Sequence, residues 1–172
     1  MKKELTRRSF LKLAGAGALA VAMSGSLTGC DVIDNLKDMD SVSAAIGDVK
    51  FMLSASVWTN GAGGQENDVT YQPTCEIRNN SKKAVTYGGS DCEVIITGVL
   101  TDKNGKEYPM TYAGENGSAP AGEKYEVKDF KLVAVGKGLY MEGCKVVTTF
   151  AYNGKKAVFT DCDGGDFTSK VE

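Results

Sequence analysis

Apolar and polar residues alternate with a period of two through most of residues 48–172, which is the pattern of half-buried β-strands. The alternation is clearest in one segment, where the apolar phase consists of Val69, Tyr71, Pro73, Cys75 and Ile77. A proline within such a run indicates a bulge or an edge position, because its backbone has no N–H to donate. No apolar pattern of helical period and ten or more residues occurs between 48 and 172.

Turn sequences divide this region into short strands. Asn153-Gly154 lies between two strand-like runs and predicts a tight hairpin, and Asp102–Gly105 predicts a second turn. A change of phase near Asp129 predicts a bulge. The strand-like segments are 51–57, 69–77, 84–87, 92–101, 106–112, 125–134, 144–152 and 155–161. About seven short strands with polar, glycine-rich turns predict an all-β fold, an antiparallel β-sandwich.

The first thirty residues follow a different pattern. Thr6-Arg7-Arg8-Ser9-Phe10-Leu11-Lys12 resembles the twin-arginine export signal, with Arg7, Arg8, Phe10 and Leu11 at its key positions. The following segment 13–23 is apolar and rich in alanine and glycine, and it is too short to cross a bilayer. The resemblance implies export from the cytoplasm.

Leu27-Thr28-Gly29-Cys30 resembles the lipobox of bacterial lipoproteins, in which the cysteine is lipidated and becomes the first mature residue. This predicts a signal peptide at 1–29, a lipidated tether at 30–47 and a β-sandwich domain at 48–172. Apolar residues of 31–47 fall on one helical face, so the tether is expected to be partly helical. A helix that docks on a partner is the alternative. Two acyl chains on Cys30 would hold the protein at the outer face of the cytoplasmic membrane, on the cell surface.

Charge and composition limit the possible functions. The first 29 residues hold five basic residues and one acidic residue, so the remaining 143 carry 15 basic against 21 acidic residues, a net charge of −6. This acidity argues against nucleic acid as a partner and against broad contact with anionic lipids. The chain has no histidine, which removes histidine-based nucleophilic catalysis and histidine metal ligands. We therefore expect neither an enzyme nor a cofactor.

Three segments together resemble immunoglobulin-like domains of unknown function in bacterial surface lipoproteins. They are Cys75-Glu76-Ile77-Arg78-Asn79-Asn80-Ser81-Lys82-Lys83, Leu100–Tyr108 with its Asp102-Lys103-Asn104-Gly105-Lys106 turn, and Ala121-Gly122-Glu123. Ala121 stands where that family usually has proline. The resemblance covers about residues 69–132 and implies an immunoglobulin-like β-sandwich without catalytic residues.

Four cysteines remain beside Cys30, and an even number in an exported domain predicts two disulfides. In the sandwich, Cys75–Cys92 and Cys144–Cys162 would each join residues at one end. One observation opposes the second pair: a two-residue Asn-Gly turn places Cys144 opposite residue 163, so that Cys144 and Cys162 point to opposite faces. Cys75–Cys144 is the alternative. The spacing of 17, 52 and 18 residues does not fit a structural zinc site.

Few motifs point to a specific site. Asp161–Glu172 resembles a calcium loop but lacks its glycine and flanking helices, so it is interpreted as a solvated acidic tail and no metal site is predicted. Trp58, Tyr87, Tyr112 and Tyr140 lie near predicted loops. Such aromatic side chains bind sugars or peptides in some proteins and more often cover the ends of a core.

Together these features predict a non-catalytic, membrane-anchored surface lipoprotein whose β-sandwich binds a protein or a glycan. The alternative is an accessory subunit of an exported enzyme complex, since the twin-arginine route carries folded proteins.

Overall fold

The computed structural model describes residues 41–60 and 68–172. Within these residues the regular structure consists of twelve β-strands, which confirms the all-β class, although about seven strands were predicted. The strands are β1 (Val42–Ile46), β2 (Val49–Asn60), β3 (Asp68–Asn79), β4 (Val85–Gly88), β5 (Val94–Thr101), β6 (Glu107–Tyr112), β7 (Gly117–Ala119), β8 (Glu123–Val127), β9 (Leu132–Val135), β10 (Lys145–Tyr152), β11 (Lys155–Cys162) and β12 (Phe167–Val171).

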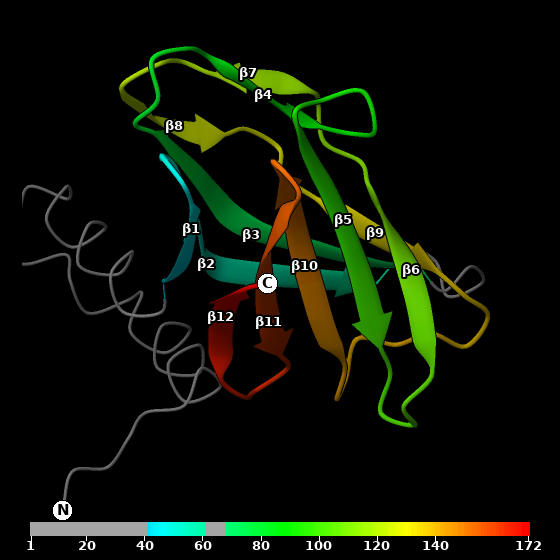
Figure 1. Ribbon diagram of the computed structural model, residues 1–172. Coiled ribbons are helices and arrows are strands. Elements are labelled where there is room, and N and C mark those ends of the chain that lie inside the picture. The colour runs from blue at the N-terminus through cyan, green and yellow to red at the C-terminus, as the bar shows by residue number, and fades with distance from the viewer. Residues whose placement is uncertain (1–40, 61–67) are drawn as a thin grey trace, which may run out of the picture.

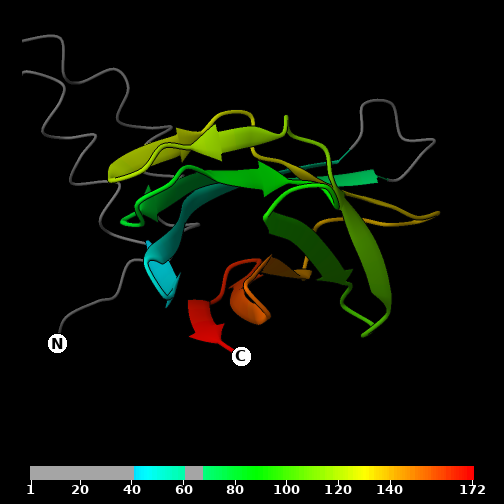
Figure 2. The same ribbon diagram turned by 45° about the horizontal axis from the view of Figure 1, so that its top comes forward.

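The strands form one sheet that curls into a nearly closed barrel (Figure 1). Its main path runs β1-β2-β3-β9-β6-β5-β10-β11-β12, and β4, β7 and β8 pair at its margin. The first and last strands of the path meet where the Ser169 hydroxyl donates a hydrogen bond of 2.9 Å to the Ser43 carbonyl. Figure 2 shows the orange and red strands β10 to β12 on one side and the green strands on the other, facing each other as the two layers of a sandwich do.

A bulge at Pro73 bends the long strand β2. Ser54 pairs with Thr74 and Val57 with Gln72, so two residues of β2 face the single residue Pro73. Of the two alternatives predicted from Pro73, a bulge and an edge position, a bulge is present, but the extra residue is on the neighbouring strand β2. It reverses the phase of β2: Val57, expected on the apolar side, is 56% exposed, and Trp58 packs inward instead.

The phase change near Asp129 has a different cause from the predicted bulge. β8 and β9 are separate strands that pair with two different parts of β3. Asp129 lies between them with a φ of 52°, a left-handed conformation that turns the chain from one strand to the next. The prediction of a bulge is corrected to a break between strands.

The domain begins earlier than residue 48. Residues 42–46 form β1 and pair with the first half of β2, and Ala44 and Ile46 are buried. The helical face expected over 31–47 does not include this part, because Val42, Ala44 and Ile46 follow the period of a strand. The predicted tether is therefore shorter than 30–47, and its residues 30–40 lie outside the described residues.

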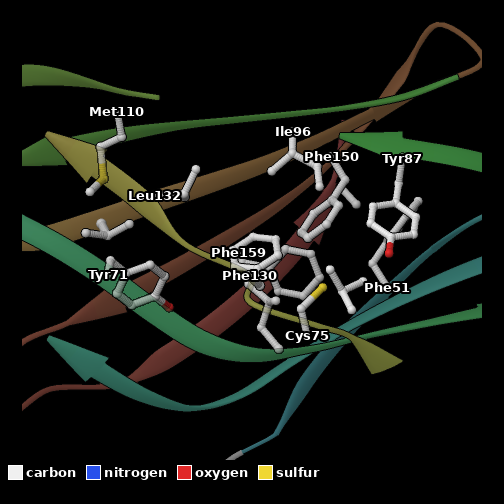
Figure 3. Packing of buried hydrophobic residues seen from close by; sticks show 14 of the residues in the cluster. Phe51, Tyr71, Cys75, Tyr87, Ile96, Met110, Phe130, Leu132, Phe150 and Phe159 are labelled. Atoms are coloured by element: carbon white, nitrogen blue, oxygen red, sulfur yellow. The ribbon is translucent and has the colours of Figure 1, made fainter. Parts of the chain in front are cut away.

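Aromatic rings from opposite walls fill the centre of the barrel (Figure 3). Phe51 of β2 stacks on Phe150 of β10 with ring centroids 4.8 Å apart, although these strands are not neighbours in the sheet. Phe159 meets the same ring edge-on at 5.5 Å, and Phe130 lies 6.0 Å from it. These contacts join the two walls of the folded sheet.

Candidate functional site

The four aromatic residues predicted as binding candidates lie on β2, β4, β6 and the loop after β9. Tyr87 is only 3% exposed, and Tyr112 packs edge-on against Phe130 with centroids 5.5 Å apart. Burial raises the pKa of Tyr112 to about 12. Trp58 is half-buried against Tyr71, at 5.1 Å. These three side chains therefore contribute to packing, and Tyr140, at 63% exposed, is the one of the four that projects outward.

Tyr140 lies in loop 136–143, which joins β9 to β10 and is fixed to the barrel at several points. Leu139 is buried in the core at 1% exposed. The backbone N–H of Met141 donates to the Asn60 side chain at 3.2 Å, and the N–H of Gly143 donates to the Asp163 carboxylate at 2.9 Å. The loop thus holds Tyr140 and Met141, which is 38% exposed, on a defined support.

The outer side of the barrel carries a band without charged side chains. Along each strand these positions alternate with buried core residues, so they point to solvent. Cross-strand pairing makes the band continuous: Thr59 lies opposite Thr70, Thr70 opposite Val133, and Val133 opposite Thr111. The residues are Thr59 on β2, Thr70 on β3, Val133 on β9, Pro109 and Thr111 on β6, Thr97 and Val99 on β5, and Val147 and Thr149 on β10. We call these nine residues the uncharged face, which follows the curve of the sheet from β2 through β3, β9, β6 and β5 to β10.

Charged side chains cover the outer side of the first half of β2, the second half of β3 and β8. Lys50, Arg78 and Lys124 lie directly opposite one another on these three strands. The ammonium of Lys124 forms an ion pair of 2.7 Å with Glu76, and Glu126 lies opposite Glu76 on β8. This part of the outer surface is therefore charged, whereas the nine residues of the uncharged face carry no charge. Sequence reasoning missed that face, although its signal was present in the Thr and Val residues between the core positions of 94–101 and 145–152.

A buried carboxylate lies where the bulge of β2 meets β11. Asp161 is 1% exposed and accepts hydrogen bonds from the Ser56 hydroxyl at 2.5 Å and the Tyr71 hydroxyl at 3.1 Å. The indole N–H of Trp58 donates to Ser56 Oγ at 3.0 Å. The predicted solvated tail is corrected here: Asp161 is inside the barrel, and residues 167–171 form β12. This cluster joins three strands and supplies hydrogen-bond donors to the buried carboxylate.

The four described cysteines are free thiols, and neither predicted pair is present. The register of the β10–β11 hairpin explains why Cys144 and Cys162 do not form a disulfide. Lys145 pairs with Cys162, and the N–H of Asp163 donates to the Cys144 carbonyl, so the two thiols point to opposite faces. Cys144 instead donates to the Tyr140 carbonyl at 2.9 Å. Burial raises the pKa of Cys75 well above its ordinary value and also raises the pKa of Cys144, which makes both thiols poor nucleophiles.

We also searched the described surface for a ligand pocket and for a metal site. A cavity of about 290 Å³ lies between the β1–β2 and β10–β11 turns and is lined by Asp48, Ser81, Tyr152 and Lys155, among others. This volume is at the lower limit of ligand pockets, about 300 Å³. Within residues 41–60 and 68–172, no group of three or more acidic or cysteine side chains is arranged to hold a metal ion.

The predicted export residues Arg7, Arg8, Phe10 and Leu11, and the predicted lipidation site Cys30, lie outside the described residues. Within the described part of the chain, no helix is long and apolar enough to span a membrane.

Comparison with known proteins supports the predicted export signal. A model of the twin-arginine translocation pathway signal sequence matches residues 4–24. The chain therefore carries a signal for export across the cytoplasmic membrane, as its arginine pair predicted. No curated protein matches the chain. Among solved structures, the X-ray structure of Northeast Structural Genomics Consortium target SoR45 is similar at 12% identity, covering 74% of this chain and 84% of that chain with a TM-score of 0.36.

Proposed function

We propose that the mature protein is a non-catalytic lipoprotein, anchored through Cys30 to the outer face of the cytoplasmic membrane, whose β-domain binds a protein partner. The observation that carries the proposal is the uncharged face. Charged residues are depleted at the centres of protein interfaces, because a buried charge must be desolvated and paired. A continuous area of Thr, Val and Pro on a domain rich in charge elsewhere has this composition.

The geometry favours a protein over a glycan as the partner. Sugar rings stack on the flat faces of exposed aromatic side chains. Trp58, Tyr87 and Tyr112 direct their rings into the packing of the barrel. β-branched side chains on a pleated sheet, in contrast, provide a regular surface against which another polypeptide packs closely.

The proposed anchor has a direct test. In the expressed full-length protein, the mature N-terminus is expected at Cys30 with the mass of a diacylglyceryl group, and Cys30→Ala is expected to release the protein from the membrane fraction. Intact-mass spectrometry and membrane fractionation measure both. An unmodified Cys30, or a Cys30→Ala protein retained like the wild type, would refute the anchor.

The proposed binding face has a separate test. Thr149 lies on β10, the last strand of the face, and its cross-strand neighbours, Thr97 of β5 and Val158 of β11, are both uncharged. The wild type, extracted gently from its own membrane, is expected to carry a partner visible by native mass spectrometry. Thr149→Lys is expected to reduce the bound fraction about tenfold or more, because a buried ammonium without a partner opposes docking.

Ser118→Lys on β7, an exposed position outside the face, is the matched control and is expected to retain the partner. Equal binding by Thr149→Lys and the control, with both proteins folded, would refute the face as the docking site. If the partner is an exported enzyme, the protein is an accessory subunit of that complex, which is the second candidate function and is favoured by the twin-arginine signal.

A further inference from the structure

We infer that one open end of the barrel binds a free α-amino acid with an apolar side chain. This inference goes beyond the proposed function, because it concerns a small molecule and a surface other than the uncharged face. Its starting observation is the cavity of about 290 Å³ between the β1–β2 and β10–β11 turns. The mouth of a β-barrel is a common position for a small-ligand site. The residues around this cavity determine which chemistry the ligand must have.

Strand directions bring three segments of the chain together at this end. Successive strands of the main path are antiparallel, so β1, β3 and β10 run in one direction and finish at the same end of the barrel. The cavity is lined by Ile46 at the end of β1, Ser81 just after β3 and Tyr152 at the end of β10. Segments that are far apart in the sequence therefore form one cavity.

Hydrogen bonds and turn geometry fix the walls of the cavity before any ligand binds. The N–H of Asn80 donates to the Asp48 carbonyl at 2.8 Å, which joins the β1–β2 turn to the segment after β3. The N–H of Ser81 donates to the side-chain oxygen of the buried Asn79 at 3.0 Å. The β10–β11 turn has the two positive φ values of a tight hairpin. A ligand therefore meets a preformed site, and little binding free energy is lost in ordering the walls.

The floor of the cavity is apolar and small. Ile46, Val49 and Tyr152 line it and are otherwise almost completely buried. A molecule that covers them removes apolar surface from water. The volume corresponds to about ten water molecules at about 30 Å³ each, so the ligand has on the order of ten non-hydrogen atoms. An amino acid with a branched aliphatic side chain, such as leucine, has this size.

The rim of the cavity carries one charge of each sign. Asp48 in the β1–β2 turn supplies a carboxylate, and Lys155 at the start of β11 supplies an ammonium. Both side chains are exposed, and neither forms an ion pair within the part of the chain that the structure describes. Asn153, Ser81 and Tyr152 add an amide and two hydroxyls as uncharged hydrogen-bonding groups. Opposite charges at the rim of an apolar floor match a zwitterion.

A free α-amino acid meets these three requirements together. Its carboxylate pairs with the Lys155 ammonium, its ammonium pairs with the Asp48 carboxylate, and its side chain covers the floor. A residue inside a polypeptide has neither of these charges, because both groups are in peptide bonds. The two charges of the rim therefore favour a free amino acid over a segment of a protein partner.

Ligand-observed NMR tests the inference. L-leucine is the probe, and saturation transferred to it from the mature, lipidated protein in detergent micelles reports binding. Empty micelles supply the baseline. We expect saturable transfer that is strongest at the leucine methyl groups, with a Kd of about 1 mM or lower. No saturable transfer at leucine concentrations well above that Kd would overturn the inference.

Two analogues test the requirement for both charges. L-leucinamide lacks the carboxylate, and N-acetyl-L-leucine lacks the ammonium. Each is expected to bind at least about fivefold more weakly than leucine, because one charge of the rim is left without its partner. If either analogue binds as tightly as leucine, the assignment to a free amino acid is wrong.

Two substitutions connect each charge of the ligand to its residue. In Lys155→Met, leucine is expected to bind no better than leucinamide, and in Asp48→Asn no better than N-acetyl-leucine. Lys145→Met removes an exposed lysine at the opposite end of β10 and is the matched control, which is expected to bind leucine as the wild type does. Circular dichroism verifies that each variant is folded. Unchanged leucine binding by either folded rim variant would contradict the proposed site.

Discussion

At the scale of single residues, buried polar groups join parts of the sheet that no strand pairing connects. The Asp161 carboxylate links β11 to Tyr71 of β3 and Ser56 of β2. Asn79, which is fully buried, donates from its side chain to the carbonyls of Lys83 and Ala119, and so fixes the β3–β4 turn to β7. Each of these buried side chains makes hydrogen bonds to protein groups in place of water. These bonds hold neighbouring segments together where the strand ladder is interrupted.

The cysteines provide a test at the same scale. Without reductant, the unfolded mature protein is expected to react with four equivalents of a maleimide, at Cys75, Cys92, Cys144 and Cys162. In the folded protein, Cys75 and Cys144 are expected to react much more slowly than the half-buried Cys92 and Cys162, because burial both shields them and raises their pKa. Mass spectrometry of labelled peptides measures each rate. Labelling that requires prior reduction would show that the disulfides form after export.

At the scale of elements, the bulge in β2 determines which side chains reach the interior. It bends the strand and exchanges inward and outward positions beyond Ser54, so that Ser56 and Trp58 turn toward Asp161 and Tyr71. Without the extra residue, Val57 would point inward and the carboxylate would lose its nearest donor. The bulge is thus the local feature that makes the buried acid possible.

Ser56→Ala tests this role. We expect a loss of about 1–2 kcal/mol in the free energy of unfolding, because Asp161 stays buried with one hydroxyl donor fewer. Urea denaturation followed by circular dichroism gives the value. Ser118→Ala, at an exposed position on β7, is the control and should change stability by less than about 0.5 kcal/mol. Equal stability of the two variants would contradict the role assigned to Ser56.

At the scale of the whole molecule, the barrel is held together across its interior. Phe150 touches rings from β2, β11 and the segment between β8 and β9. The wall formed by β10 to β12 is therefore packed against the wall formed by β2 and β3 through a shared set of aromatic contacts. Closure of the sheet between β1 and β12 depends on this packing more than on the hydrogen bond from Ser169 to Ser43.

Phe150→Ala is accordingly expected to destabilise the protein by about 3–5 kcal/mol, the usual range for loss of a buried phenylalanine. Calorimetry and urea denaturation measure the loss. Val135→Ala, at a position that is 72% exposed, removes apolar atoms without opening a cavity and should be nearly neutral. A small effect of Phe150→Ala would mean that the two walls are stable independently.

Local patterns predicted much of this molecule. The alternation of Val69 to Ile77, the bulge at Pro73 and the Asn153-Gly154 hairpin are present as expected, and Asn153 and Gly154 have the positive φ values of 49° and 72° that such a turn requires. These features depend on neighbouring residues. The number of strands, the start of the domain and the uncharged face depend on which strands meet. A short strand such as β1 is recognised only once β2 lies beside it.

The arrangement of β1 also determines how the barrel bears a load. Five residue pairs join β1 to β2 in the antiparallel sense. If the membrane and a bound partner move apart in the direction of β1, the pull on Ser41 is directed along that strand. The hydrogen bonds of this ladder then resist in shear and share the force, whereas a pull across the strand would break them one after another. The position of β1 at the edge of the sheet, which makes it the first strand exposed to tension, also makes it a mechanical clamp.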